Sequence, residues 1–111
     1  MKEYRPWGWY DVLHESIGCK VKKIHVNPRS RLSLQSHRFR REIWVCIRGE
    51  GRAQIDDSIT NLTVGTTVDI PQGARHRLDN PSDSFMEIIE TQLGDYFGED
   101  DITRYEDDYG R

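Results

Sequence analysis

Four polar side chains in this sequence are of the types that bind metal ions in proteins. Gln35 and His37 are separated by one residue, so on a β-strand both side chains point to the same face. Glu42 lies five residues after His37, at the start of an apolar run, and can face the same cavity from a neighbouring strand. His76 follows Pro71–Gly73, a turn that can present a side chain at the mouth of a barrel. Two imidazoles, one carboxylate and one amide oxygen suit a site for one divalent metal ion.

Each of these residues also has a simpler explanation when it is considered alone. A single histidine on a strand is usually a structural or surface residue, and a Gln-x-His pair is a weak signal by itself. Glu42 can also serve only to neutralise Arg40 or Arg41. The ligand set does not select a metal, since it suits zinc, nickel, iron and manganese.

The spacing of the whole set resembles the two sequence motifs of the cupin superfamily. The first motif is matched by Arg29, five residues, Gln35-Ser36-His37, four residues, Glu42, six residues and Gly49. Arg29 and Gln35 depart from this motif, which has glycine and histidine at those positions. The second motif is matched at every fixed position by Gly65, five residues, Pro71-Gln72-Gly73, two residues, His76, three residues and Asn80. The resemblance implies an all-β, single-domain jelly-roll barrel that binds one metal ion in its interior.

A closer resemblance, to the type II mannose-6-phosphate isomerase family, covers almost the entire chain. It is carried by Arg5–Tyr10, Leu32–His37, Arg40, Glu42, Trp44, His76–Leu78, Asn80-Pro81, Glu90, Gln92, Gly94, Gly98–Ile102 and Glu106–Arg111. Phosphomannose isomerases have Gln-x-His in place of His-x-His, which accounts for Gln35. The resemblance implies zinc as the metal, with Gln35, His37, Glu42 and His76 as its ligands.

The reaction implied by this resemblance is the interconversion of mannose 6-phosphate and fructose 6-phosphate through a cis-enediol(ate). In the family, this cupin is often the C-terminal module behind a mannose-1-phosphate guanylyltransferase domain. A chain of 111 residues cannot hold both domains, and it has no glycine-rich phosphate loop, so we expect an isomerase module that stands alone. The resemblance also leads us to expect a homodimer.

Isomerisation needs a base near C1 and C2 and cations for the phosphate and the enediolate. Lys22 can act as the base if it faces the cavity, because desolvation lowers the pKa of a lysine; the simpler interpretation is a solvated strand lysine. Arg40 and Arg77 are candidate clamps for phosphate or enediolate, since a guanidinium binds such groups bidentately. Glu90 and Gln92 alternate on the last long strand, where they reach the cavity or form cross-strand pairs.

Two other functions compete with the isomerase. A non-catalytic cupin would bind a sugar or sugar nucleotide and act with a separate mannose-1-phosphate guanylyltransferase. A different cupin enzyme, such as a dioxygenase, usually uses a histidine-rich site and redox-active iron. Gln35 and the absence of a third histidine ligand argue against the dioxygenase.

The candidate site residues must be positioned by short β-strands, because patterns typical of strands recur along the whole sequence. The expected strands are 19–26, 32–35, 43–48, 52–55, 59–64, 67–70, 76–78 and 85–91. Turn residues between them recur roughly every 8–12 residues, which is typical of a sandwich or barrel. We expect an N-terminal arm over 1–18, a barrel over 19–92 and an acidic segment over 93–111 packed on the barrel. A turn or two of helix within 100–107 is the one exception to strand.

Composition and charge exclude several classes of protein. The aromatic content of 10% argues against disorder, although the mean hydropathy is −0.80. No apolar run approaches the roughly 20 residues of a membrane span, and the N-terminus lacks a signal-peptide pattern, so we expect a cytoplasmic protein. Residues 20–52 carry ten Lys/Arg against two Glu, whereas 95–111 carry seven acids against two Arg. This basic region can bind a sugar phosphate or the acidic tail; no nucleic-acid motif accompanies it. Cys19 and Cys46 are expected to be free thiols.

Overall fold

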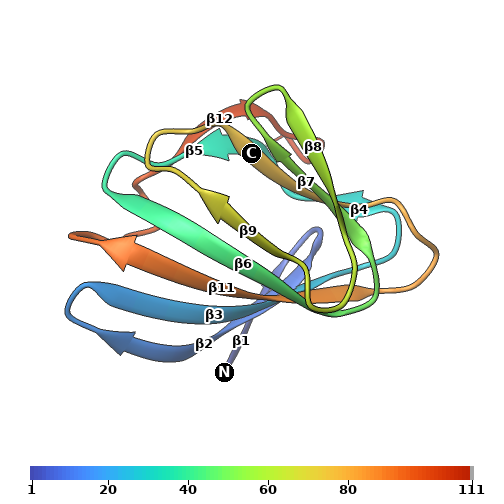
Figure 1. Cartoon of the computed structure of the whole chain (residues 1–111), viewed down its shortest axis with the longest axis horizontal. Helices are drawn as coiled ribbons and strands as arrows, with labels where there is room; N and C mark the ends of the chain where they lie inside the picture. The colour runs from blue at the N-terminus through green and yellow to red at the C-terminus, as the bar shows by residue number, and fades with distance from the viewer. Residues whose placement is uncertain (111) are drawn as a thin grey trace.

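The computed structural model describes residues 1–110 and shows an all-β chain of two antiparallel sheets that face each other (Figure 1). The strands are β1 (Lys2–Arg5), β2 (Gly8–Ser16), β3 (Cys19–Val26), β4 (Ser30–Arg31), β5 (Leu34–Ser36), β6 (Arg40–Arg48), β7 (Gly51–Ile55), β8 (Ser58–Leu62), β9 (Thr67–Ile70), β10 (His76–Asn80), β11 (Met86–Gly94) and β12 (Thr103–Glu106). Within the described residues there is no helix long and apolar enough to cross a membrane.

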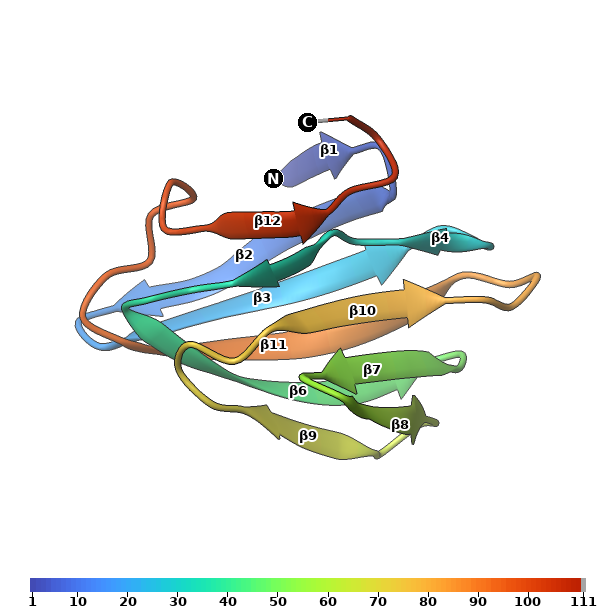
Figure 2. The ribbon, with the colours of Figure 1, turned by 90° about the horizontal axis from the view of Figure 1, so that it is seen from above.

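Each sheet contains six strands. One sheet has the order β1-β2-β3-β11-β6-β9, and the other has the order β12-β5-β10-β7-β8, with β4 paired to β10. Figure 2 shows β12 extending the second sheet beside β5. The long strands β3, β11 and β6 pair over most of their length, so the register of these three strands determines which side chains meet inside.

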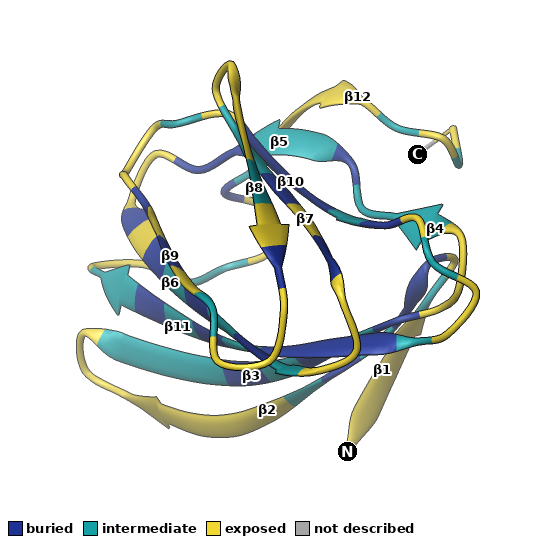
Figure 3. Cartoon of the chain, turned by 45° about the vertical axis from the view of Figure 1, so that its right-hand side comes forward, coloured by how far each residue is buried: buried dark blue, intermediate teal, exposed yellow. Residues whose placement is uncertain are grey.

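The interior has an apolar end and a polar end. At the apolar end, Ile88 pairs with Ile24 on one side and with Cys46 on the other. Four residues further along β11, Gln92 pairs with Glu42. All five of these residues are buried, with at most 5% of their surface exposed. Figure 3 shows the buried residues along β6, β10 and β11. The alternation of side chains along a strand therefore carries one continuous inward row from a packed core into a polar pocket.

Most of the expected strands are confirmed, with small differences at their ends. The helical turn expected within 100–107 is wrong, because Thr103–Glu106 is β12 and pairs with β5. This polar segment has no apolar stripe to bury as a helix, and the edge of β5 satisfies its backbone hydrogen bonds instead. Residues 2–16 of the expected arm form the hairpin of β1 and β2, which pairs with β3.

The two turns that flank the first motif have different backbone requirements. Gly49 has φ +71°, and a Cβ built there would lie 2.6 Å from the carbonyl oxygen of Phe85, so only glycine fits. Arg29, which replaces the glycine of the motif, has φ +52° and pairs with Asp83 at the surface. Residue 29 therefore keeps the left-handed backbone conformation although it is arginine and not glycine, the residue that adopts this conformation most readily. Cys19 and Cys46 are both free thiols, as expected.

Candidate metal centre

Three ionisable side chains predicted as metal ligands converge at the polar end of the interior. His37 follows β5, Glu42 lies on β6, and His76 begins β10. One potential ligand atom from each lies within 4.8 Å of those of the other two. The Nε2 atoms of His37 and His76 are 3.3 Å and 3.6 Å from the two carboxylate oxygens of Glu42. All three residues are buried, so water does not compete freely for these atoms.

Backbone carbonyl groups fix the proton on each imidazole. Nδ1 of His37 lies 2.7 Å from the carbonyl oxygen of Asp101, and Nδ1 of His76 lies 3.1 Å from that of Ala74. A carbonyl oxygen can only accept, so each Nδ1 donates and each Nε2 keeps its lone pair toward Glu42. This second hydrogen bond is the feature that orients a metal-ligating histidine.

Burial keeps both imidazoles neutral. Desolvation, together with the charges of Arg40 and His76, lowers the pKa of His37 to about 4. Desolvation also lowers the pKa of His76. A neutral imidazole is the form that binds a metal ion, so both rings are ready to do so at neutral pH.

Gln35 lies beside this cluster. It pairs directly with His76 across β5 and β10, so the two side chains lie on the same face of the sheet, and both line the pocket. The amide nitrogen of Gln35 donates to the Ser33 carbonyl oxygen at 3.3 Å and to Ser33 Oγ at 3.0 Å. The amide oxygen is therefore the atom of Gln35 that suits a metal ion.

Arg40 contacts the same acceptor atoms. Its Nε donates to Glu42 Oε2 at 3.1 Å, and one terminal nitrogen lies 3.2 Å from His37 Nε2. The other terminal nitrogen is buried without a hydrogen-bond partner among the described residues. The acceptor atoms of His37 and Glu42 thus contact the Arg40 guanidinium, which does not use all of its hydrogen-bond donors. A donor set of this composition fits a divalent metal ion, with Gln35, His37, Glu42 and His76 as its holders.

A second carboxyl group lies next to the centre. Glu90 is buried on β11, and its Oε1 accepts from Trp44 Nε1 at 3.1 Å, a nitrogen that also donates to Glu42 Oε1 at 3.1 Å. Gln92 Nε2 donates to Glu90 Oε2 at 2.8 Å. Burial and the charge of Glu42 raise the pKa of Glu90 to about 7. Glu90 and Gln92 therefore lie in the interior, which was one of the two positions that the sequence left open for them.

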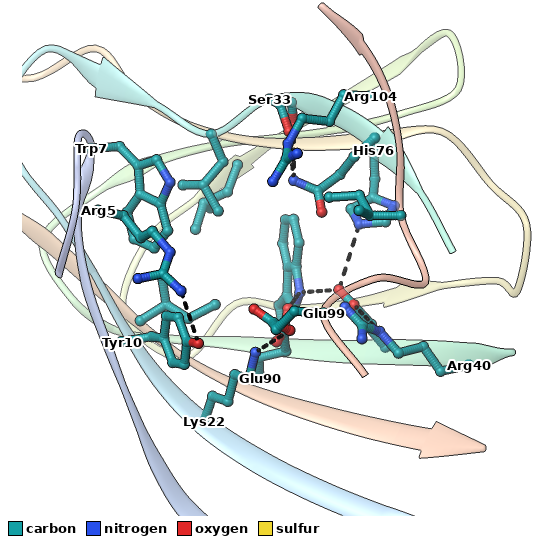
Figure 4. Close-up of a pocket in the computed structure, with 17 residues that line it drawn as sticks. Arg5, Trp7, Tyr10, Lys22, Ser33, Arg40, His76, Glu90, Glu99 and Arg104 are labelled. Atoms are coloured by element: carbon teal, nitrogen blue, oxygen red, sulfur yellow. Dashed lines mark hydrogen bonds and ion pairs between the residues drawn. The ribbon is translucent and has the colours of Figure 1, made fainter. Parts of the chain in front are cut away.

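The pocket continues away from the centre between apolar and charged walls (Figure 4). The apolar side chains that line it are Trp7, Ile24, Leu32, Trp44, Leu78 and Ile102. Lys22 and Tyr10 line the side across from His76 and Arg40, and Glu99 lies between the two sides (Figure 4). Lys22 Nζ is 3.2 Å from Glu99 Oε2, so this predicted site residue faces the cavity.

Arg77 does not join the other predicted residues. It alternates with His76 and Leu78 on β10, both of which line the pocket, so its side chain points to the other face of the sheet. There it is buried and donates to the Leu32 carbonyl oxygen and to both the carboxylate and the carbonyl oxygen of Glu106.

Sequence reasoning did not single out several residues that line the pocket, among them Arg5, Tyr10, Glu99 and Arg104. Arg104 pairs with Gln35, which pairs with His76, so a row across three strands places Arg104 on the pocket face. The first three lie in segments that carry the family resemblance, which was the available signal. Nothing in the local pattern showed that these segments close over the barrel interior.

The two-sheet barrel and its buried His-Glu-His cluster define a cupin. Solved structures with the same fold include a cupin 2 conserved barrel domain protein from Salinispora arenicola, with a TM-score of 0.69 and 20% identity, covering 77% of this chain and 74% of that one. CapF, a capsular polysaccharide assembling protein from Staphylococcus aureus, has a TM-score of 0.78 and 20% identity, covering 96% of this chain and 34% of CapF.

Among the cupins, the chain can be assigned to one particular family. Residues 1–107 match the family described as mannose-6-phosphate isomerase C-terminal, and the chain belongs to that family. The xanthan biosynthesis protein XanB of Xanthomonas campestris pv. campestris (strain B100) is 46% identical over 110 residues, which are 99% of this chain and 24% of XanB. The alginate biosynthesis protein AlgA of Pseudomonas aeruginosa is 47% identical over 108 residues, which are 97% of this chain and 22% of AlgA.

A third relative is named for a different activity. The mannose-1-phosphate guanylyltransferase ManC of Salmonella typhimurium is 42% identical over 108 residues, 97% of this chain and 22% of ManC. The chain thus spans about a quarter or less of the length of the curated relatives that it matches.

Proposed function

We propose that this chain is a metal-dependent aldose–ketose isomerase that interconverts mannose 6-phosphate and fructose 6-phosphate through a cis-enediol(ate). The observation that carries the proposal is the pair of neutral, buried imidazoles held by carbonyl groups around Glu42. Membership of the mannose-6-phosphate isomerase family supports this substrate.

Gln35, His37, Glu42 and His76 would hold one divalent ion, and we propose zinc. Such an ion supplies Lewis acidity toward the oxygens at C1 and C2 of the open-chain sugar. Arg40, already directed at Glu42 and His37, contributes a fixed positive charge for the developing enediolate. Arg40 and Glu42 are both buried, which strengthens the interaction between their charges.

Glu90, rather than the Lys22 expected from sequence, is our candidate for the group that carries the proton. Its carboxyl group lines the pocket beside Glu42 and Trp44. In the protein without a metal its pKa of about 7 makes both the acid and the base available near neutral pH. The ammonium group of Lys22 is held in an ion pair with Glu99.

The test is an assay of mannose 6-phosphate turnover, in which fructose 6-phosphate is measured by a coupled reaction. Metal-free protein is compared with protein loaded with zinc, nickel, manganese or iron. We expect turnover only with metal, a loss of at least about 100-fold in His76→Ala, and no loss in His14→Ala, which removes an exposed histidine of β2.

The second candidate is a non-catalytic module that binds a sugar or sugar nucleotide and acts with a separate mannose-1-phosphate guanylyltransferase. It is favoured by the similarity to ManC and by the small share of each relative that the chain spans. Absence of turnover with every metal, together with binding of a sugar nucleotide, would replace the isomerase by this module.

A further inference from the structure

Three donor side chains meet at the side of the pocket opposite the candidate metal centre. They come from adjacent strands: Arg5 ends β1, Tyr10 lies on β2 and Lys22 lies on β3 (Figure 4). Lys22 Nζ lies 4.2 Å from the centroid of the Tyr10 ring, and Arg5 donates to the Tyr10 hydroxyl at 3.3 Å. This set, which we name the Arg5–Tyr10–Lys22 cradle, offers two cations and one hydroxyl to the cavity.

The cradle already holds an anion supplied by the chain itself. Glu99, on the loop between β11 and β12, places its carboxylate 3.2 Å from Lys22 Nζ. Burial opposes ionisation of Glu99, but the charge and hydrogen bond of Lys22 outweigh it, so the pKa of Glu99 lies below its usual range. Burial and the charge of Glu99 raise the pKa of Tyr10, so the hydroxyl keeps its proton.

The two partners of this ion pair differ in burial. The side chain of Lys22 is 5% exposed, whereas that of Glu99 is 53% exposed. A buried ammonium group needs an anion, because an unpaired buried charge is strongly unfavourable. The Glu99 carboxylate is half exposed, so it can return to water when another anion takes its place beside Lys22. The donor side chains of the cradle therefore stay in place, whereas the Glu99 carboxylate can be exchanged for another anion.

We propose that the Arg5–Tyr10–Lys22 cradle binds the phosphate group of the sugar-phosphate substrate, which displaces the Glu99 carboxylate from it. The assignment rests on the proposed function for the nature of the substrate. A phosphate dianion has more charge and more acceptor oxygens than a carboxylate, so it matches the two cations and the hydroxyl better.

This location also fits an extended substrate. The cradle and the candidate metal centre line one pocket from opposite sides, with Glu99 between them (Figure 4). An open-chain sugar phosphate carries its carbonyl group and its phosphate at opposite ends, so one molecule can contact both. Lys22 is then a substrate-binding cation and not the base, and Glu99 competes with the substrate for it.

The test measures binding of mannitol 6-phosphate, which has no carbonyl group to isomerise, to the zinc-loaded protein by calorimetry. In Glu99→Gln the internal competitor loses its charge, and we expect binding to tighten about 3–5-fold. Lys22→Gln is expected to weaken binding at least about tenfold. Arg5→Gln, at a half-buried position, is expected to weaken it as well and covers the case in which Lys22→Gln does not fold.

Glu106→Gln is the matched control. It also removes an ion pair between the C-terminal segment and a buried cation, Arg77, but on the face away from the pocket, so affinity should not change. Unphosphorylated mannitol should bind equally to wild-type protein and to Glu99→Gln, because the cradle recognises the phosphate.

Unchanged affinity for mannitol 6-phosphate in both Glu99→Gln and Arg5→Gln would overturn the assignment. Because this ligand is not turned over, the two proposals can fail separately. The expected binding pattern without any isomerase activity would leave the phosphate subsite standing and remove the isomerase. Isomerase activity without this pattern would remove the phosphate subsite alone.

Discussion

At the scale of single residues, Glu90 and Lys22 illustrate how partners determine a role. The two residues face each other across β11 and β3, and both are buried at the pocket. Glu90 is surrounded by Trp44, Gln92 and Glu42, so burial and a like charge raise its pKa. Lys22 has an anionic partner, Glu99, which stabilises its charge. Their surroundings suit Glu90 to carry a proton and Lys22 to bind an anion.

The substitution Glu90→Gln separates these roles kinetically. We expect kcat for mannose 6-phosphate to fall by about 10²–10⁴-fold with little change in KM, because the amide cannot take up the proton. Lys22→Gln should chiefly raise KM. Steady-state kinetics of the two zinc-loaded variants checks this expectation. If Glu90→Gln keeps the kcat of the wild type, a group other than Glu90 transfers the proton.

Arg77 is expected to act on stability and not on the substrate. Its three hydrogen bonds to Leu32 and Glu106 connect β10 to the C-terminal strand. Arg77→Gln should lower the free energy of unfolding by about 2 kcal/mol, because buried charged hydrogen bonds are lost. Arg52→Gln, which removes the exposed pair with Asp79 on the same sheet, should cost less than about 1 kcal/mol.

Urea unfolding measures both effects. The KM of Arg77→Gln for mannose 6-phosphate, measured below its unfolding transition, should equal that of the wild type. A large increase in KM with unchanged stability would restore Arg77 as a substrate clamp.

At the scale of elements, the segment over 95–110 lines one side of the pocket and orients His37, a candidate metal ligand. The Asp101 carboxylate accepts from the backbone N–H groups of Arg38 and Phe39, at 2.9 Å and 3.0 Å. The Asp101 carbonyl oxygen accepts from His37. The acidic tail thus packs on the basic middle of the chain through specific pairs, including Arg31 with Asp108. Charge complementarity made this contact one of the alternatives for the basic region, and the hydrogen bonds give it a single geometry.

The contribution of Glu99 to this docking should depend on pH. In the folded state the pKa of Glu99 lies below its ordinary value of about 4.5, so the ionised form stabilises the folded state above about pH 4.5. This stabilisation is lost as the pH falls through the folded pKa. Lys22, Arg40 and Lys20 are the cations responsible, and burial acts in the opposite direction.

Denaturant unfolding of wild-type protein and Glu99→Gln across pH 3–7 tests this dependence. The difference in the free energy of unfolding should be present at neutral pH and shrink below about pH 4.5. A difference that stays constant over the whole range would show that Glu99 does not titrate with folding.

At the scale of the whole molecule, the two sheets bury one continuous interior that changes from apolar to polar along its length. The apolar end packs Val26, Met86 and Ile88 with almost no exposure and supplies hydrophobic stabilisation. The polar end tolerates buried Glu42, Glu90 and Lys22 because each is hydrogen-bonded or ion-paired. The hydrophobic core and the candidate site are thereby separated within one small barrel.

The homodimer expected from the family resemblance stays a prediction. The first sheet ends at the exposed strand β1, whose outer backbone groups a second copy can cover. Sedimentation equilibrium of the purified chain should give twice the 13.1 kDa of one copy. A mass of one copy at every concentration would contradict it.

The sequence by itself determined the class of fold, the family and the candidate ligands. Strand periodicity and turn residues are local properties of the sequence. The motif spacings of Gln35, His37, Glu42 and His76 can likewise be recognised along the chain without knowing how the strands pair. An interior position was one of the alternatives that the sequence left open for Lys22, and an ion pair with Glu42 was one of those for Arg40.

Only the tertiary structure decided which other residues share the pocket. Arg77 follows a ligand in the chain, yet strand alternation turns it to the opposite face. Arg5 lies 30 residues before Gln35, and Glu99 lies 23 residues after His76. Strand pairing and the C-terminal segment nevertheless bring both residues to the same pocket. The polar residues near the chain end form β12 because an unpaired edge of β5 was available. Such contacts depend on register between segments far apart in sequence, which local patterns do not encode.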